Sequence, residues 1–189
     1  MELAAVGAPP ALLEQASTAI QDEIKHAKLA FKFAGQLLDQ PIGPSGLDIS
    51  NSVVEQPDWA DLIRDTFLDG CLGEGMAAAQ AAVASKHCDA PYDAAWRCIA
   101  AEEGAHAELA WGFVEWSLNE SPNLAHALAA CVPAARARVE TPVERDDREG
   151  LMAFGILSRT QEAEIAKREF DLVIQPRVSR LLEPSLDPA

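Results

Sequence analysis

Two short segments of the sequence each carry a glutamate followed three residues later by a histidine. Glu23 precedes His26 in this way, and Glu103 precedes His106. Carboxylate and imidazole groups both bind transition metals, and a spacing of three residues places the two side chains on one face of a helix. A single motif of this kind arises easily by chance. Taken alone, it is better explained as an ion pair at the surface of a helix.

The surroundings of the two motifs match. Residues 22–33 align without a gap with residues 102–113, an offset of 80 residues (103 − 23), and each segment follows an Ala-Pro step. We interpret them as two copies of one helix. In both copies the glutamate and histidine interrupt a stripe of apolar residues, and a buried carboxylate needs a cation, a hydrogen-bond network or a metal. The duplication therefore favours a metal site over two surface ion pairs.

A third acidic residue, Glu74, lies between the two copies on a stripe that also contains Ile63 and Phe67. The same turn is crowded by three glycines, Gly70, Gly73 and Gly75. Each glycine costs a helix about 1 kcal/mol relative to alanine. Such a cost indicates a close helix approach, a bulge, or room for oxygen or a substrate. A weak helical turn without function is the alternative.

Proline and glycine divide the sequence into long stretches that are typical of helices. No segment alternates apolar and polar residues as a half-buried strand would, so we predict an all-α fold. The predicted helices are residues 9–40, 58–86, 91–119, 122–138 and 146–182, the last interrupted or kinked at Pro176. Residues 41–57 form a connection longer than is usual in a bundle, and we interpret it as a crossover. The 189 residues fit a single domain, 1–189.

Composition excludes several classes of function. The sequence has 15 Lys and Arg against 30 Asp and Glu, a net charge of −15, which argues against binding to nucleic acid or to an anionic membrane. Residues 1–22 contain no basic residue and no membrane-spanning apolar run, so we predict no signal peptide. The four cysteines form no C-x-x-C pattern, which fits a reduced, cytoplasmic protein.

The repeated motif resembles the ferritin-like di-iron carboxylate superfamily, and more closely the bacterial "ferritin-like domain" proteins. The motifs shared with these proteins are D-E-x-x-H-A-x-L, at residues 22–29, and G-C-x-G-E, at residues 70–74. The likeness covers about residues 5–120. It implies a four-helix bundle that holds two iron ions, or iron and manganese or manganese alone. It also implies an oxidase or oxygenase that acts on a small-molecule substrate with O2 or peroxide.

The resemblance assigns roles by position. The metal ligands that it implies are Glu23, His26, Glu74, Glu103 and His106. The glutamates of the two repeats would bridge the metals, each histidine would bind one metal, and Glu74 would be a terminal ligand beside His106. Asp22 would orient His106 and Glu102 would orient His26, although the usual residue at the second position is Asp. The alternative that these two acids are solvated stays open.

One ligand of the family's set has no counterpart in the sequence. The residue equivalent to Glu74 would lie 80 residues earlier, before Met1 (74 − 80 = −6), so we expect residues 1–7 to be the end of a truncated first helix. Three explanations stay open: the sequence begins too late, a partner helix or a homo-oligomer completes the bundle, or the site is incomplete. In the last case the protein would be a helical scaffold or interaction protein. Iron storage or detoxification is a further alternative.

Overall fold

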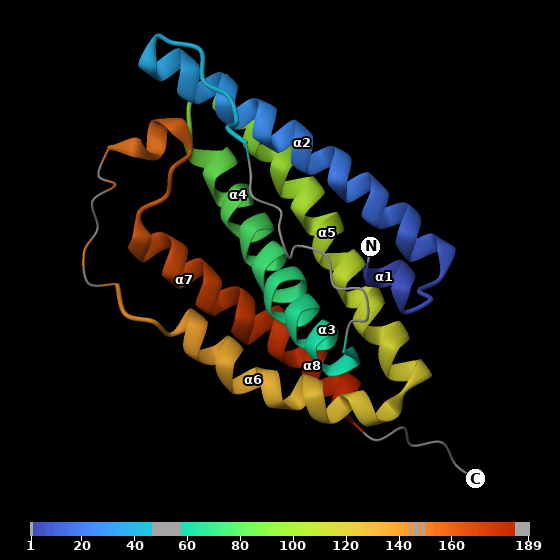
Figure 1. Ribbon diagram of the computed structural model, residues 1–189. Helices are drawn as coiled ribbons and strands as arrows, with labels where there is room; N and C mark the ends of the chain where they lie inside the picture. Colours follow the sequence, from blue (N-terminus) through green and yellow to red (C-terminus); the bar gives the residue numbers. More distant parts are fainter. Residues whose placement is uncertain (1, 47–57, 144, 146–147, 149, 184–189) are drawn as a thin grey trace. The chain divides into compact units, whose positions relative to one another are not determined.

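The computed structural model describes residues 2–46, 58–143, 145, 148 and 150–183 (Figure 1). These residues form helices and no strand, which confirms the all-α prediction. The chain contacts divide it into two compact units, residues 1–57 and 58–189, and each is described by itself. The assignment of 1–189 to a single domain stays a prediction.

The first unit is built on one long helix, α2 (Pro10–Leu38), which confirms the helix predicted at residues 9–40. Pro10 fits its first turn, where a missing N–H leaves no helical hydrogen bond unmade. The helix ends at Asp39, which adopts a left-handed conformation. One turn of helix, α1 (Glu2–Ala5), precedes it, and residues 41–46 follow it without regular structure. The rest of the predicted crossover, 47–57, lies outside the described residues.

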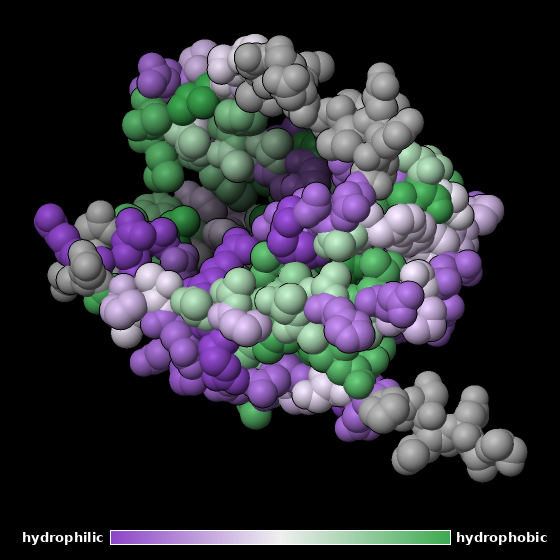
Figure 2. Space-filling view, turned by 60° about the horizontal axis from the view of Figure 1, so that its bottom comes forward, coloured by the Kyte–Doolittle hydropathy of each residue, from purple (hydrophilic) through white to green (hydrophobic). Residues whose placement is uncertain are grey.

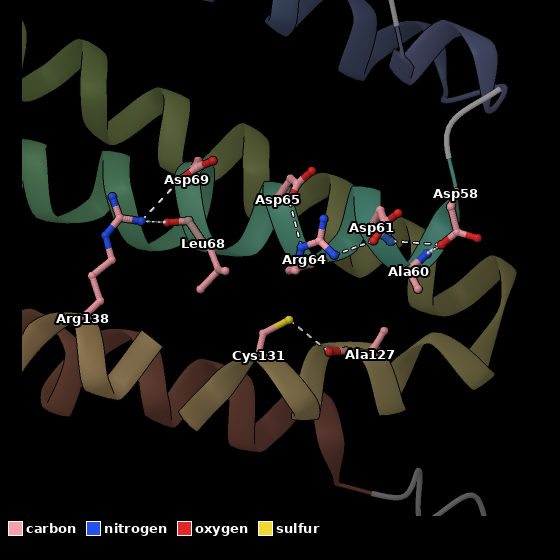
Figure 3. Close-up of polar contacts among 10 residues, drawn as sticks. All are labelled: Asp58, Ala60, Asp61, Arg64, Asp65, Leu68, Asp69, Ala127, Cys131 and Arg138. Atoms are coloured by element: carbon pink, nitrogen blue, oxygen red, sulfur yellow. Dashed lines mark hydrogen bonds and ion pairs between the residues drawn. The ribbon is translucent and has the colours of Figure 1, made fainter. Parts of the chain in front are cut away.

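The second unit begins with one continuous helical run in three parts: α3 (Trp59–Asp65), the π-helix η1 (Thr66–Glu74) and α4 (Gly75–His87). This run matches the helix predicted at residues 58–86. Its start is fixed by Asp58, whose Oδ1 accepts hydrogen bonds from the backbone N–H groups of Ala60 at 2.8 Å and Asp61 at 3.1 Å (Figure 3). Such a cap satisfies amide groups that have no partner within the helix.

One of the three glycines of this turn, Gly70, lies in the π-helical part at a close helix crossing. A β-carbon on Gly70 would lie 2.5 Å from the β-carbon of Ala110, so only glycine fits at this helix crossing. Arg138 stabilises the same segment from another helix, because its Nη1 donates to the carbonyl oxygen of Leu68 at 3.0 Å and to Asp69 Oδ1 at 3.3 Å (Figure 3). Two of the interpretations offered for the glycines, a close helix approach and a bulge, are therefore confirmed.

The next two predicted helices are also confirmed. Helix α5 (Tyr92–Glu120) matches residues 91–119, and α6 (Ala125–Val139), entered through the 3-10 turn η2 (Pro122–Leu124), matches residues 122–138. Helices α4 and α5 run side by side (Figure 1). The largest fully buried side chains of the unit come from α3, η1, α5, α6 and η4 (Phe170–Ile174): Ile63, Phe67, Leu72, Phe113, Val114, Leu128, Phe170 and Ile174.

The prediction of a helix over residues 146–182 was wrong in its first part. Among the described residues before Ser158, only a 3-10 turn, η3 (Leu151–Phe154), forms in this part, and Gly150 and Gly155 on either side of it have φ values of 82° and 80°, which no α-helix contains. Helix α7 (Arg159–Glu169) begins at Ser158, whose hydroxyl accepts from Gln161 N at 3.1 Å. Residues 146, 147 and 149 lie outside the described part of the chain.

The helical run from α7 continues to Leu182 through a second π-helix, η4 (Phe170–Ile174), and α8 (Gln175–Leu182). The predicted interruption at Pro176 takes the form of this π turn, which ends just before the proline. Proline has no N–H and its ring crowds the preceding turn, so a regular α-helical ladder is disturbed at this point.

Among the described helices, none combines the length and the apolar character needed to cross a membrane. Figure 2 shows hydrophilic and hydrophobic residues interspersed over the face that it displays.

Candidate metal centre

Three predicted ligands come together within the second unit. Glu74, Glu103 and His106 each offer one ligand atom, and these atoms lie within 4.8 Å of one another. Glu74 is the last residue of η1, whereas Glu103 and His106 both belong to α5. The prediction that these residues share a site rested on sequence spacing and on the resemblance to the ferritin-like superfamily. In the structure, the packing of η1 against α5 brings the three residues together.

The pair on α5 has the geometry expected from its spacing. Glu103 Oε2 lies 3.3 Å from His106 Nδ1. Both residues are buried, with 8% and 7% of their surfaces exposed. Burial of a carboxylate is unfavourable in free energy unless its charge is compensated. Histidine supplies this compensation only when it is protonated, whereas a metal ion supplies it without a proton and binds the neutral imidazole.

Glu74 lies where the helical hydrogen-bond pattern changes. The π-helix η1 ends at this residue and α-helical geometry resumes at Gly75. Single π turns inside α-helices occur frequently at functional sites, because the extra residue changes the direction in which neighbouring side chains point. The exact position of this turn was not predicted from the sequence, although the glycines indicated a bulge.

The other two predicted ligands lie in the first unit. Glu23 and His26 are on α2, where Glu23 Oε1 lies 3.7 Å from His26 Nδ1. The pair has the same spacing as the α5 pair, as the alignment of the two segments predicts. The Glu23 side chain is 56% exposed, however, whereas Glu103 is buried as expected from its apolar stripe. That the two pairs join in one dinuclear site stays a prediction.

The two acids that precede the motifs lie on different helices. Asp22 lies on α2 directly before Glu23. Glu102 lies on α5, and its Oε1 accepts a hydrogen bond from Cys98 Sγ at 3.4 Å. The orientation of His106 by Asp22 and of His26 by Glu102 stays a prediction.

A buried cysteine close to the site in sequence is not a candidate nucleophile. Cys71 is fully buried three residues before Glu74. Burial raises the pKa of its thiol, because the surroundings disfavour the charged thiolate. Since the thiolate is the reactive and metal-binding form, we interpret Cys71 as part of the core.

Sequence reasoning missed a cavity that borders this site. Glu103 lines a cavity of about 430 Å³ together with apolar residues of α4 and α5 and with residues 155–157. One wall depends on Trp96, whose indole Nε1 donates to the carbonyl oxygen of Phe154 at 2.9 Å. The contact joins residues 58 positions apart, so no local pattern in the sequence could indicate it.

The donor set fits iron or manganese. It combines two carboxylates with one imidazole. Oxygen and nitrogen ligands of this kind suit iron and manganese better than thiolate ligands do. The residues that would hold a metal in the second unit are Glu74, Glu103 and His106. Comparisons with protein-family models, with curated proteins and with solved structures found no match to this chain.

Proposed function

We propose that this protein is a ferritin-like di-iron carboxylate protein that uses O2 or peroxide to oxidise a small molecule. The observation that carries the proposal is the gathering of Glu74, Glu103 and His106 on two packed helices, with two of the three buried. A buried carboxylate such as Glu103, with the second acid Glu74 beside it, is unfavourable in free energy without a cation. Iron bound there would supply the electrons for reduction of oxygen or peroxide.

The second half of the proposed site comes from the duplicated motif. In this proposal Glu23 and His26 of α2 join the ligands of the second unit, so that two E-x-x-H motifs and one additional glutamate hold two metals. Glu23, Glu103, His26 and His106 would hold the ions together with Glu74. The protein's part is to fix these ligands and to shield the metals from bulk water.

Metal analysis tests the proposal directly. The full-length protein is stripped with a chelator, loaded with ferrous iron without oxygen, freed of unbound iron by gel filtration and analysed. We expect about two irons per chain, as in other dinuclear carboxylate bundles. Glu103→Ala should reduce this below about one, because a bridging ligand serves both ions. Glu120→Ala, an exposed acid at the end of the same helix, is the matched control and should retain wild-type iron.

A further variant separates a dinuclear site from a mononuclear one. Glu23→Ala should lower the iron content if α2 contributes a bridge, whereas one iron per chain that is insensitive to this change would assign the metal to the second unit alone. Less than one iron per chain, unchanged by Glu103→Ala, would contradict the proposal and favour a helical scaffold. Many irons per chain in a large assembly would instead favour storage.

A further inference from the structure

The cavity beside Glu103 has the size of a binding site for a small organic molecule. Its volume of about 430 Å³ lies within the range of roughly 300–1,000 Å³ that is typical of ligand pockets. It is lined by α4, α5, residues 155–157, Arg148 and Glu162, all of the second unit. Glu103 belongs both to its wall and to the cluster of ligands, so a molecule in the cavity would lie next to the candidate metal centre.

Most of the wall is apolar. The residues that give it this character are Ala77, Ala81, Ala84, Ile99, Ile156 and Leu157. Alanines on the α4 side keep the space open, because larger side chains there would fill it. Apolar walls favour an apolar ligand, since its burial removes hydrophobic surface from water.

The polar groups of the wall bind one another. Arg148 pairs with Glu162 and also donates from Nη1 to the carbonyl oxygen of Leu157 at 3.3 Å. Gln80 Nε2 donates to the backbone carbonyl of Glu162 at 3.4 Å. The charge of Arg148 is therefore compensated, while the carboxylate of Glu103 disfavours a second anion. This arrangement selects an uncharged ligand over a carboxylate or a phosphate.

The wall formed by residues 154–157 is held firmly against α5. Gly155 has φ +80°, and a β-carbon at this position would collide with the indole of Trp96. The same indole donates to the carbonyl oxygen of Phe154 at 2.9 Å. Nearby, the amide of Asp89 donates to the carbonyl oxygen of Ala153 at 2.9 Å. The cavity is thus formed before any ligand enters, which reduces the entropy lost on binding.

We propose that this cavity binds the substrate of the protein, and that the substrate is an uncharged, mainly apolar small molecule. Only the role of the ligand as a substrate rests on the proposed function, because binding itself requires no metal. The lining residues also predict the orientation of the bound molecule. The part that reacts lies at Glu103, and the apolar remainder lies along α4.

Calorimetric titration of the chelator-treated, full-length protein with straight-chain primary alcohols tests the binding. From 1-butanol to 1-octanol the affinity should rise about fourfold for each methylene, as expected for burial of one such group. Octanoate, which has the same chain length and a negative charge, should bind at least about tenfold more weakly than 1-octanol. No binding of 1-octanol, or equal binding of octanoate, would overturn the proposal.

Variants place the ligand in the cavity. Ala81→Leu fills the space from α4 and should weaken 1-octanol binding at least about tenfold, because the added side chain takes the place of the ligand. Ala94→Leu makes the same change at an exposed position of α5 outside the cavity and should bind like the wild type. Ala77→Leu, at a less buried position of the wall, replaces Ala81→Leu in this experiment if circular dichroism shows that Ala81→Leu does not fold. Unchanged binding in folded wall variants would overturn the proposal.

Cobalt loading tests the relation of the cavity to the metal. In protein loaded with Co²⁺, saturating 1-octanol should shift the visible absorption of the ion, because Glu103 borders the cavity and the metal. Unshifted bands with 1-octanol bound would contradict a substrate role. Absence of cobalt and iron binding would contradict the proposed function, while the titration with the metal-free protein would still decide whether the cavity binds apolar molecules.

Discussion

Gly70 packs so closely against Ala110 that a β-carbon added to Gly70 would lie 2.5 Å from the β-carbon of Ala110. Two residues that both carry side chains cannot approach in this way. The contact joins η1 to α5, the two elements that carry Glu74 and the pair Glu103 and His106. The glycine therefore sets the distance between the two helices that supply the candidate ligands.

Gly70→Ala should destabilise the second unit. Alanine gains about 1 kcal/mol over glycine in a helix, but overpacking costs typically about 1–3 kcal/mol, and this contact is at the severe end. We expect a net loss of about 1–2 kcal/mol in the free energy of unfolding, measured with urea. Gly73→Ala is the control, because its β-carbon would meet no atom closer than Leu68 O at 3.7 Å. Equal stability of the two variants would contradict the close approach.

Arg138 should support the π-helix and, through it, the position of Glu74. Its guanidinium donates both to the carbonyl oxygen of Leu68 and to Asp69. Arg138→Ala should lower the free energy of unfolding by about 0.5–1.5 kcal/mol, since the side chain is half exposed and its hydrogen bonds compete with water. Iron content in the loading experiment should fall as well.

A second variant separates the two contacts of Arg138. Asp69→Asn weakens the ion pair but leaves the hydrogen bond to Leu68 in place. Because exposed ion pairs contribute little, this change should affect stability and iron content less than Arg138→Ala does. If Asp69→Asn lowers the free energy of unfolding and the iron content as much as Arg138→Ala does, the hydrogen bond from Arg138 to the carbonyl oxygen of Leu68 does not stabilise the π-helix.

Cys71 should resist alkylation in the folded protein. Its side chain is buried, and burial raises the pKa of the thiol, so the reactive thiolate is scarce at a given pH. With iodoacetamide at pH 8, mass spectrometry should find Cys71 unmodified in native protein and modified in guanidinium chloride. Cys88, less buried at the end of α4, should be labelled faster, and equal labelling of the two in native protein would contradict the burial of Cys71.

The long helices could be predicted because their apolar patterns and proline boundaries are local features. Helix α2 (Pro10–Leu38) and helix α5 (Tyr92–Glu120) both begin and end within two residues of the predicted limits. The predicted beginning of the last helix, at residue 146, was wrong because the start of α7 depends on the backbone conformation of the residues before it. Gly150 and Gly155 adopt positive φ values that a helical pattern of side chains does not reveal.

The candidate site also has some features that are local in the sequence and others that depend on contacts between distant segments. The spacing of Glu103 and His106 fixes their common face on any helix, so their pairing could be predicted from sequence. The π turn before Glu74 and the cavity beside Glu103 depend on contacts between distant segments. Ala110 against Gly70 and Trp96 against Phe154 are such contacts, and they form only when the helices pack.

Glu169, at the end of α7, should make stability depend on pH. Burial raises its pKa above the usual value for a glutamate, while the neighbouring Arg168 opposes this in part. A raised pKa in the folded state means that folding disfavours the charged form. This loss of stability is present in full above the raised pKa and disappears below the unfolded value, where the group is protonated in both states.

Glu169→Gln should therefore raise the Tm at pH 7, and the gain should shrink as the pH falls toward 4. The measurement is the difference in Tm between variant and wild type across this range, because the titration of all other acids largely cancels in the difference. Glu164→Gln, at an exposed position of the same helix, controls for the loss of one negative charge. A gain for Glu169→Gln that is constant with pH, or no larger than that of Glu164→Gln, would mean that the folded protein does not disfavour ionised Glu169.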